Sequence, residues 1–203
     1  MADKIFMPAY WPFFKNGELR RFDYKSPDGS MPPFTSVFSY DKGSDSMLYN
    51  NYDSKGVWLN KWYYQYNPGF GVAEWRDDYP GNKKVVLKPP IGWGEFITVG
   101  GSYQNKPQFD FFRCWPPAQG SGDQIVYMEQ HLTSFTACAI TYQDVIQFTY
   151  LQSWGGKPAT GARYWMALNV GPVATQFLTQ DEKDPAKISE TGRWDAVVTR
   201  VNV

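Results

Sequence analysis

One pair of residues has the types and the spacing for proton transfer. Glu129 and His131 stand two positions apart in the stretch VYMEQHLTSF, and His131 is the only histidine of the 203 residues. Residues two apart on a strand project from the same side with Cα atoms about 6.5 to 7 Å apart, so the carboxylate can reach and orient the imidazole ring. With Arg163 nearby, the three side chains would form a polar cluster whose burial tunes a general acid or base. This pattern predicts a catalytic role for Glu129, His131 and Arg163 in an isomerase, cyclase or lyase that needs no cofactor.

The same pair also has a structural interpretation. A strand that faces solvent on one side alternates polar and apolar residues, and a Glu-x-His sequence arises there without any function. Over residues 125–132 the even positions are mostly apolar and the odd positions are amphipathic. The role of the pair therefore depends on whether the odd face meets an enclosed space or solvent.

Other catalytic and metal-binding patterns are absent from the sequence. It has no GxSxG elbow, no P-loop and no GxGxxG after a strand, so no motif specifies a reaction and the question of enzyme or binding protein stays open. With a single histidine, neither a metal site nor a cofactor is expected, and the acidic pairs at 77–78 and 181–182 are interpreted as turn and surface residues.

Aromatic residues give a denser signal than the histidine. Trp, Tyr and Phe make up 18% of the chain, and several of them share one strand face in VWLNKWYYQY (57–66), with more rings on later strands. Such rings give large contact areas and carry polar tips, which suits an apolar or aromatic ligand or a stacked sugar, although rings also simply fill a wide barrel. The predicted ligand contacts are Trp58, Trp62, Tyr64, Trp75 and Trp165, with Glu129, His131 and Arg163 as the polar end.

Strand and turn signals dominate the elements that must position these residues. Runs rich in Tyr, Trp, Phe, Val, Thr and Ile alternate with clusters of Gly, Pro, Asp and Asn, and the short turns imply antiparallel neighbours. So many strands must close or stack, because a wide open sheet would leave unpaired edges. The sequence predicts an all-β antiparallel meander that forms a barrel or a curved half-barrel, with a two-sheet sandwich as the alternative. The predicted strands are residues 18–24, 35–40, 46–52, 57–66, 70–77, 83–88, 95–103, 108–114, 124–133, 135–142, 144–152, 162–169 and 173–179.

One short C-terminal helix is predicted in the segment DEKDPAKISETG. Asp184 can cap it, Pro185 fits its first turn and Gly192 can end it, so that it would form a lid or plug over the sheet. The chain length favours a single domain over residues 1–203, with a possible division at the Pro-rich loop near 115–122.

A late hairpin adds a local resemblance. The segment ARYWMALNVGPVATQFL (162–178) has an aromatic strand, a turn containing Gly171 and Pro172, and a returning strand that starts at Val173. With Tyr164 and Trp165 on its first strand, it resembles a hairpin of lipocalin-like and LolA-like antiparallel meanders. The resemblance implies a curved sheet that encloses an apolar ligand, and it carries over no site residue.

Charge and cysteine content narrow the partners and the compartment. Twenty basic residues balance twenty acidic ones, so there is no basic stripe to hold a nucleic acid. No apolar run reaches the length of a membrane span, and the start of the chain, MADKIFMPAYWPFF, does not read as a signal peptide. Cys114 and Cys138 lie outside any CxxC spacing and are expected to be reduced, which favours a cytoplasmic location.

Together these features predict a cytoplasmic β-barrel that binds a small hydrophobic or aromatic molecule in an aromatic-lined cavity. Three other classes stay open. A cofactor-independent enzyme would place Glu129 and His131 inside that cavity, and a carbohydrate-binding module would expose a flat row of Trp and Tyr. A structural assembly protein would present its rings on an edge and form homo-oligomers.

Overall fold

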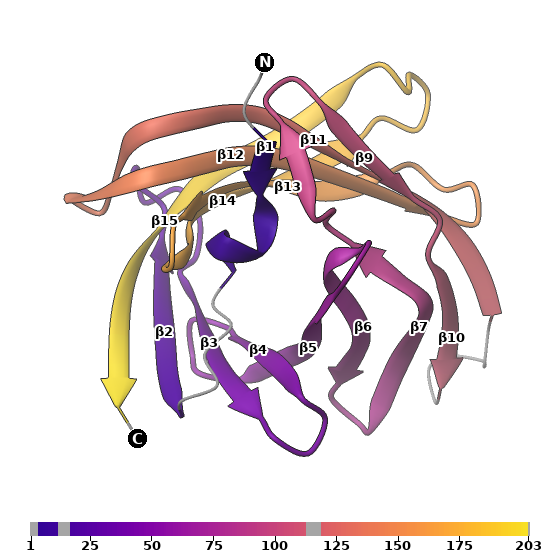
Figure 1. The fold of residues 1–203 in the computed structure, drawn as a ribbon, viewed down its shortest axis with the longest axis horizontal. Coiled ribbons are helices and arrows are strands. Elements are labelled where there is room, and N and C mark those ends of the chain that lie inside the picture. Colours follow the sequence, from indigo (N-terminus) through magenta and orange to yellow (C-terminus); the bar gives the residue numbers. More distant parts are fainter. Residues whose placement is uncertain (1–3, 12–16, 113–118, 203) are drawn as a thin grey trace.

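The computed structural model describes residues 4–11, 17–112 and 119–202 (Figure 1). Cys114 lies outside the described residues, as do residues 115–118 of the loop that was expected to divide the sheet. The rest of that loop, 119–122, begins a strand that belongs to the main sheet.

Twelve antiparallel strands form a closed barrel in which each pairs with the barrel strands that precede and follow it. The last strand pairs with the first over eight residues, which closes the ring. The predicted antiparallel meander is confirmed, and closure removes the edges that an open sheet would expose. The barrel strands are β2 (Glu18–Lys25), β3 (Phe34–Asp41), β4 (Ser46–Tyr52), β5 (Trp58–Asn67), β6 (Gly71–Tyr79), β7 (Lys83–Gly92), β10 (Gln108–Phe112), β11 (Gln119–Ala137), β12 (Ile140–Trp154), β13 (Thr160–Ala167), β14 (Gly171–Gln180) and β15 (Ile188–Asn202).

Three further strands lie outside this ring. The segment predicted as one strand over 95–103 forms two short strands, β8 (Phe96–Thr98) and β9 (Ser102–Asn105). Strand β8 pairs with β1 (Lys4–Phe6), and β9 pairs with the part of β11 that follows its contact with β10.

The predicted strand over 135–142 is divided by a hairpin turn: residues 135–137 end β11 and residues 140–142 begin β12. Cys138 and Ala139 have φ of 49° and 63°, and this left-handed backbone joins β11 to β12. The two strands are long, with 19 and 15 residues, so the hairpin extends beyond the rest of the sheet (Figure 1).

The predicted C-terminal helix is wrong. The Asp181 carboxylate accepts bonds from the backbone N–H of Lys183 and Asp184, forming a turn, and the chain then enters β15 at Ile188. Pairing of β15 with both β14 and β2 outweighs the local helix signals, because a helix here would leave two strand edges unpaired. Within the described residues the one helical segment is the 3-10 turn η1 (Met7–Tyr10) near the other end of the chain.

Large aromatic side chains fill much of the barrel interior. Phe22 on β2, Phe38 on β3 and Phe148 on β12 are completely buried. The rings of Phe22 and Phe38 meet edge to face at 5.0 Å, and Tyr24 stacks on Phe34 at 4.3 Å. A ring of twelve strands is wide, and these rings supply the volume that smaller side chains would leave empty.

The N-terminal segment plugs one end of the barrel. Met7 and Trp11 are buried, and the Trp11 ring packs against Tyr64 at 4.9 Å and Trp93 at 5.4 Å. The Met7 N–H donates to the Glu95 carbonyl, which ties the segment to the loop before β8. Figure 1 shows η1 within the ring of strands.

The tip of the β11–β12 hairpin covers part of the outer face of the barrel. The Cys138 thiol and the Tyr142 hydroxyl reach the backbone carbonyls of Asp195 and Ala196 on β15, two strands beyond β13. Beneath the tip, Phe135 stacks on Trp165 at 5.6 Å with an interplanar angle of 17°. A second, smaller apolar core therefore lies between the hairpin and the sheet.

Replacing Phe22 by alanine tests the packing of the interior. Phe22→Ala should lower the free energy of unfolding by about 3 to 5 kcal/mol, because the ring is fully buried among other rings and leaves a cavity. Phe96→Ala is the control, since that ring is 54% exposed and should cost less than about 1 kcal/mol. Urea denaturation measures both values, and equal costs would contradict this packing.

Candidate functional site

Two adjoining cavities lie inside the barrel. The mouth cavity, of about 620 Å³, opens at the end opposite the plug, between the loops that carry Pro33 and Ser54 and the start of β13 at Thr160. The inner cavity, of about 120 Å³, lies against β6 and β7. Three aromatic side chains line both cavities: Trp62, Tyr150 and Tyr164.

Aromatic rings form a wall that the two cavities share. Tyr150 and Tyr164 stack nearly parallel, with centroids 6.0 Å apart, and Trp93 meets Tyr150 edge to face at 4.5 Å. On the far side of the barrel Trp62 packs edge to face on Tyr49 at 5.1 Å. Each ring is held by a neighbouring ring, so the wall is preorganised.

A β-bulge brings two carboxyl groups to the inner cavity. Glu74 and Asp77 stand three apart on β6, and regular alternation would send them to opposite faces. Across β5, however, Tyr64 pairs with Glu74 and Tyr63 pairs with Arg76, so Trp75 is an extra residue without a partner. Both acids consequently line the inner cavity.

The two acids are buried, with Glu74 and Asp77 each 8% exposed. The interpretation of Asp77 as a surface acid is therefore wrong, because that interpretation assumed regular alternation along the strand. Its neighbour Asp78 does face outward, where it forms an ion pair with Arg76 at 2.8 Å and accepts a bond from the Tyr63 hydroxyl.

Burial governs the ionisation of the acid pair. It raises the pKa of Glu74 to about 7, against the opposing effect of hydrogen bonding to Tyr64 and Asp77. Burial, with the adjacent Glu74 charge, raises the pKa of Asp77 well above its ordinary value. Two desolvated carboxyl groups this close share a proton at neutral pH, because ionising both would bury two like charges.

Several polar atoms around the inner cavity have no partner among the described residues. They include Oδ1 of Asp77, Oε1 of Gln152 and Nε1 of Trp93. The other Asp77 oxygen, Oδ2, accepts a long bond of 3.4 Å from the Tyr79 hydroxyl. Buried polar atoms normally find partners, so these atoms can bind a ligand.

The aromatic residues predicted on β5 divide between two faces. Trp62 lines both cavities and Tyr64 lines the inner cavity. Trp58 lines neither cavity, because the register between β4 and β5 shifts next to it. Asn60 pairs with Asn51 and Trp58 pairs with Tyr52, which leaves one residue of β5 between them without a partner. The extra residue, Leu59, lines the mouth cavity in its place.

The other two predicted rings lie outside both cavities. Trp75, the bulge residue of β6, donates through Nε1 to the Ser46 hydroxyl at 3.1 Å and packs against Tyr63 on the outer face. Trp165 lies under the tip of the β11–β12 hairpin against Phe135. Their burial comes from packing on the outer face of the barrel.

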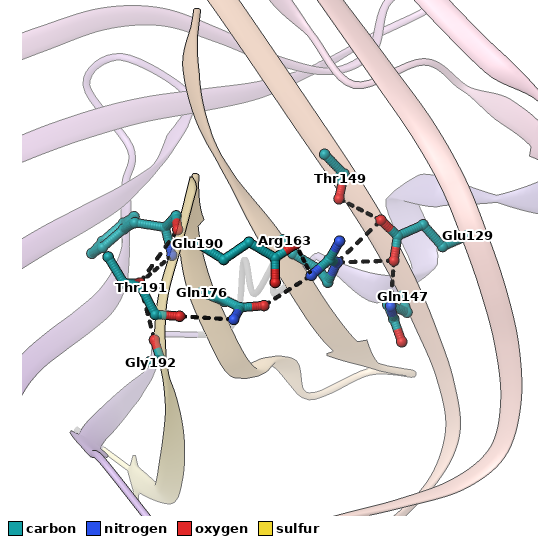
Figure 2. A network of polar contacts seen from close by, with 9 residues as sticks. Glu129, Gln147, Thr149, Arg163, Gln176, Glu190, Thr191 and Gly192 are labelled. Carbon is teal, nitrogen blue, oxygen red and sulfur yellow. Dashed lines mark hydrogen bonds and ion pairs between the residues drawn. The ribbon is translucent and has the colours of Figure 1, made fainter. Parts of the chain in front are cut away.

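Glu129 and Arg163 lie together, but on the outer face of the sheet (Figure 2). Arg163 Nε donates to both Glu129 oxygens at 3.1 and 3.0 Å, and its Nη1 donates to Gln176 and Glu190. The Thr149 hydroxyl donates to Glu129 at 2.6 Å. This network joins β11 to β15 across the intervening strands and lines neither cavity.

A bulge also separates Glu129 from His131. Glu129 is the extra residue in the pairing of β11 with β12, so His131 pairs with the core residue Ile146 and points to the other face. At the plugged end of the barrel, His131 Nε2 lies 2.7 Å from the Asp144 carboxylate, and the Tyr10 hydroxyl donates to the same oxygen at 2.6 Å. Although burial opposes it, hydrogen bonding to Tyr10 and His131 lowers the pKa of Asp144.

The His131 contact is a surface feature and not part of a cavity. Its side chain is 42% exposed and that of Asp144 41%. Their bonds to Tyr10 anchor the N-terminal plug, which gives the histidine a structural role in this arrangement.

The described part of the chain has neither a metal-binding cluster nor a membrane-spanning helix. No group of three or more His, Cys, Asp or Glu side chains there is arranged to hold a metal ion. Among the same residues no helix has the length and apolarity needed to cross a membrane.

The buried acid pair should give the protein an unusual pH dependence. Since the folded state keeps a proton that the unfolded chain has lost, the free energy of unfolding should fall between pH 5 and pH 8, by roughly 3 kcal/mol for Glu74 alone. The double variant Glu74→Gln/Asp77→Asn should remove most of this slope. Urea denaturation across the pH range measures it, with Asp78→Asn as the outward-facing control; a flat wild-type profile would contradict the burial of the pair.

The outer network should contribute stability through direct coupling. In a double-mutant cycle of Glu129→Gln and Arg163→Met, we expect a coupling energy of about 1 kcal/mol, because the pair is mostly shielded from water. Thermal or urea unfolding of the four proteins measures this energy. Strictly additive effects would show that the contact contributes nothing.

Comparison with known proteins gave no relatives. No family model, no curated protein and no solved structure matched the chain.

Proposed function

We propose that the protein binds a small, largely apolar or aromatic molecule inside the barrel. The body of the ligand would occupy the mouth cavity, and its polar end would reach the inner cavity. The observation that carries this proposal is that two adjoining cavities share Trp62, Tyr150 and Tyr164, with rings along the path and free polar atoms at its end.

The size and lining of the mouth cavity support the proposal. Its volume of about 620 Å³ lies within the range of pockets that take small organic ligands, roughly 300 to 1,000 Å³. Phe34, Leu178 and Trp194 add apolar wall, and Thr175 adds a buried hydroxyl that has no partner within the described part of the chain. A mainly apolar wall with a few convergent polar groups is typical of ligand sites.

The local resemblance of residues 162–178 to lipocalin-like and LolA-like meanders points in the same direction. These residues form β13, the following turn and most of β14, and Tyr164 and Leu178 of this hairpin line the mouth cavity. A curved sheet around an apolar ligand is what that resemblance implies.

The enzymatic alternative based on Glu129 and His131 has no support in the geometry. Both side chains lie away from the two cavities, and they face opposite sides of β11. An acid–base role, if the ligand is a substrate, falls instead to Glu74 and Asp77, since both line the inner cavity and burial raises the pKa of each.

Titration with the neutral fluorescent probe N-phenyl-1-naphthylamine tests the proposal. The wild type should bind it saturably, and Trp62→Ala should weaken binding about tenfold or more, because one wall of both cavities is lost. Trp58→Ala is the matched control, with the same residue type on the same strand but outside both cavities.

Circular dichroism would establish that each variant folds. Equal affinities of the wild type, Trp62→Ala and Trp58→Ala would place the probe elsewhere, and no saturable binding of the probe or of any other small apolar molecule to the wild type would overturn the proposed function.

A further inference from the structure

We infer that the inner cavity binds the ammonium group of an organic cation whose apolar or aromatic body occupies the mouth cavity. This inference rests on the proposed function and names the chemical class of the ligand. Three independent features of the inner cavity support it: its charge, its free acceptors and its ring faces.

The charge of the cavities favours a cation. Glu74 and Asp77 line the inner cavity and Asp53 lines the mouth, whereas no Lys, Arg or His is among the described residues that line either one. Inside a barrel the effective dielectric is lower than in water, so an unbalanced acid pair attracts a cation more strongly than it would at the surface. An anion would meet two carboxyl groups with no base to offset them.

Free acceptors are already oriented toward the cavity. Among the described residues, Oδ1 of Asp77, a side chain more than nine-tenths buried, and Oε1 of Gln152 accept no hydrogen bond, apart from the proton that Asp77 shares with Glu74. An ammonium group carries donors only, up to three of them, so it satisfies such acceptors. Trp93 offers only one free donor, whereas a carboxylate or phosphate ligand would need several donors, so an anion fits the inner cavity less well.

Ring faces complete the surroundings of a bound cation. Trp62, Tyr64, Trp93, Tyr150 and Tyr164 line the inner cavity together with the acids. The negative face of an aromatic ring attracts ammonium groups, and cages of rings with a nearby acid select them. The inner cavity is also about one fifth as large as the mouth, 120 against 620 Å³, which suits a small charged head on a larger apolar body.

Binding of a cation should also displace the proton that the acid pair shares. The other titratable groups that face the pair are phenols from β5, β6, β12 and β13, while β7 and the residue that follows it contribute only Ile91 and Trp93. Burial raises the pKa of Tyr64, Tyr150 and Tyr164, which keeps these three phenols neutral. Asp78 lies on the outer side of β6 in its ion pair with Arg76. The affinity for an ammonium ligand should therefore rise between pH 6 and pH 8, whereas that for a neutral ligand should not. The phenols are Tyr64, Tyr79, Tyr150 and Tyr164.

Isothermal titration calorimetry with three matched compounds tests the inference. We expect 2-phenylethylammonium to bind about tenfold or more tightly than 2-phenylethanol, and 3-phenylpropanoate to bind more weakly than both. Asp77→Asn should lower the affinity for the ammonium compound about tenfold and leave that for the alcohol nearly unchanged. Glu74→Gln serves as a second test of the acid pair, and Asp78→Asn, on the same strand but facing outward, should match the wild type.

The outcomes separate the two proposals. If the neutral probe and the alcohol bind but the ammonium compound shows no preference, or if Asp77→Asn and Glu74→Gln leave its affinity unchanged, the inference is wrong and the proposed function stands. If no compound binds saturably, the proposed function fails and the inference fails with it.

Discussion

The pairing of β15 with β2 is the contact on which the rest of this structure depends. It joins the last ring strand to the first over eight residue pairs and turns a meander into a closed ring. Every other contact in the ring joins consecutive ring strands, with only the short β8 and β9 intervening between β7 and β10, so this one pairing fixes which side chains face an enclosed interior. Without it the aromatic faces of β2 to β7 and of β12 to β14 would belong to two edges of an open sheet, and the cavities between them would not exist.

Irregularities in the strands decide what that interior contains. Extra residues at Leu59, Trp75 and Glu129 each reverse the alternation of a strand. At Trp75 the reversal turns a second acid inward and creates the Glu74–Asp77 pair, while at Glu129 it moves the glutamate and the histidine to opposite faces. Bulges often re-aim side chains near functional sites, and here the inward-turned acids lie beside the free polar atoms of the inner cavity.

Much of the fold was predictable from the sequence. Strand runs and short turns predicted an antiparallel meander that forms a barrel or a curved half-barrel, and the structure has the closed form. The boundaries of β3, β4 and β5 fall within one residue of the predicted ones. Local signals could not show that the predicted C-terminal helix was wrong, because Asp184, Pro185 and Gly192 do fit a helix. What excludes it is the need of β14 and β2 for a common neighbour, and that need appears only once the ring is assembled.

The site was predictable only in part, for a different physical reason. Regular alternation correctly places Trp62 and Tyr64 at the inner cavity. Trp58 is separated from them by the extra residue Leu59, and Trp75 is itself an extra residue, so both face away from the cavity. The sequence did not indicate that Glu74 and Asp77 form a pair, because two residues three positions apart on a regular strand point to opposite faces. A single extra residue in a strand leaves no mark in composition or spacing, yet it determines which carboxyl groups are buried.

The central claim is that a cation with an apolar body binds inside this barrel with its charge at the acid pair. A crystal structure with 4-bromophenylethylammonium tests it most directly, because the anomalous signal of bromine locates the ring independently of the protein model. We expect the bromine in the mouth cavity between Trp62 and Tyr164, with the nitrogen within hydrogen-bond distance of Asp77 Oδ1. Bromine on the outer face, or a nitrogen directed away from Glu74 and Asp77, would contradict it.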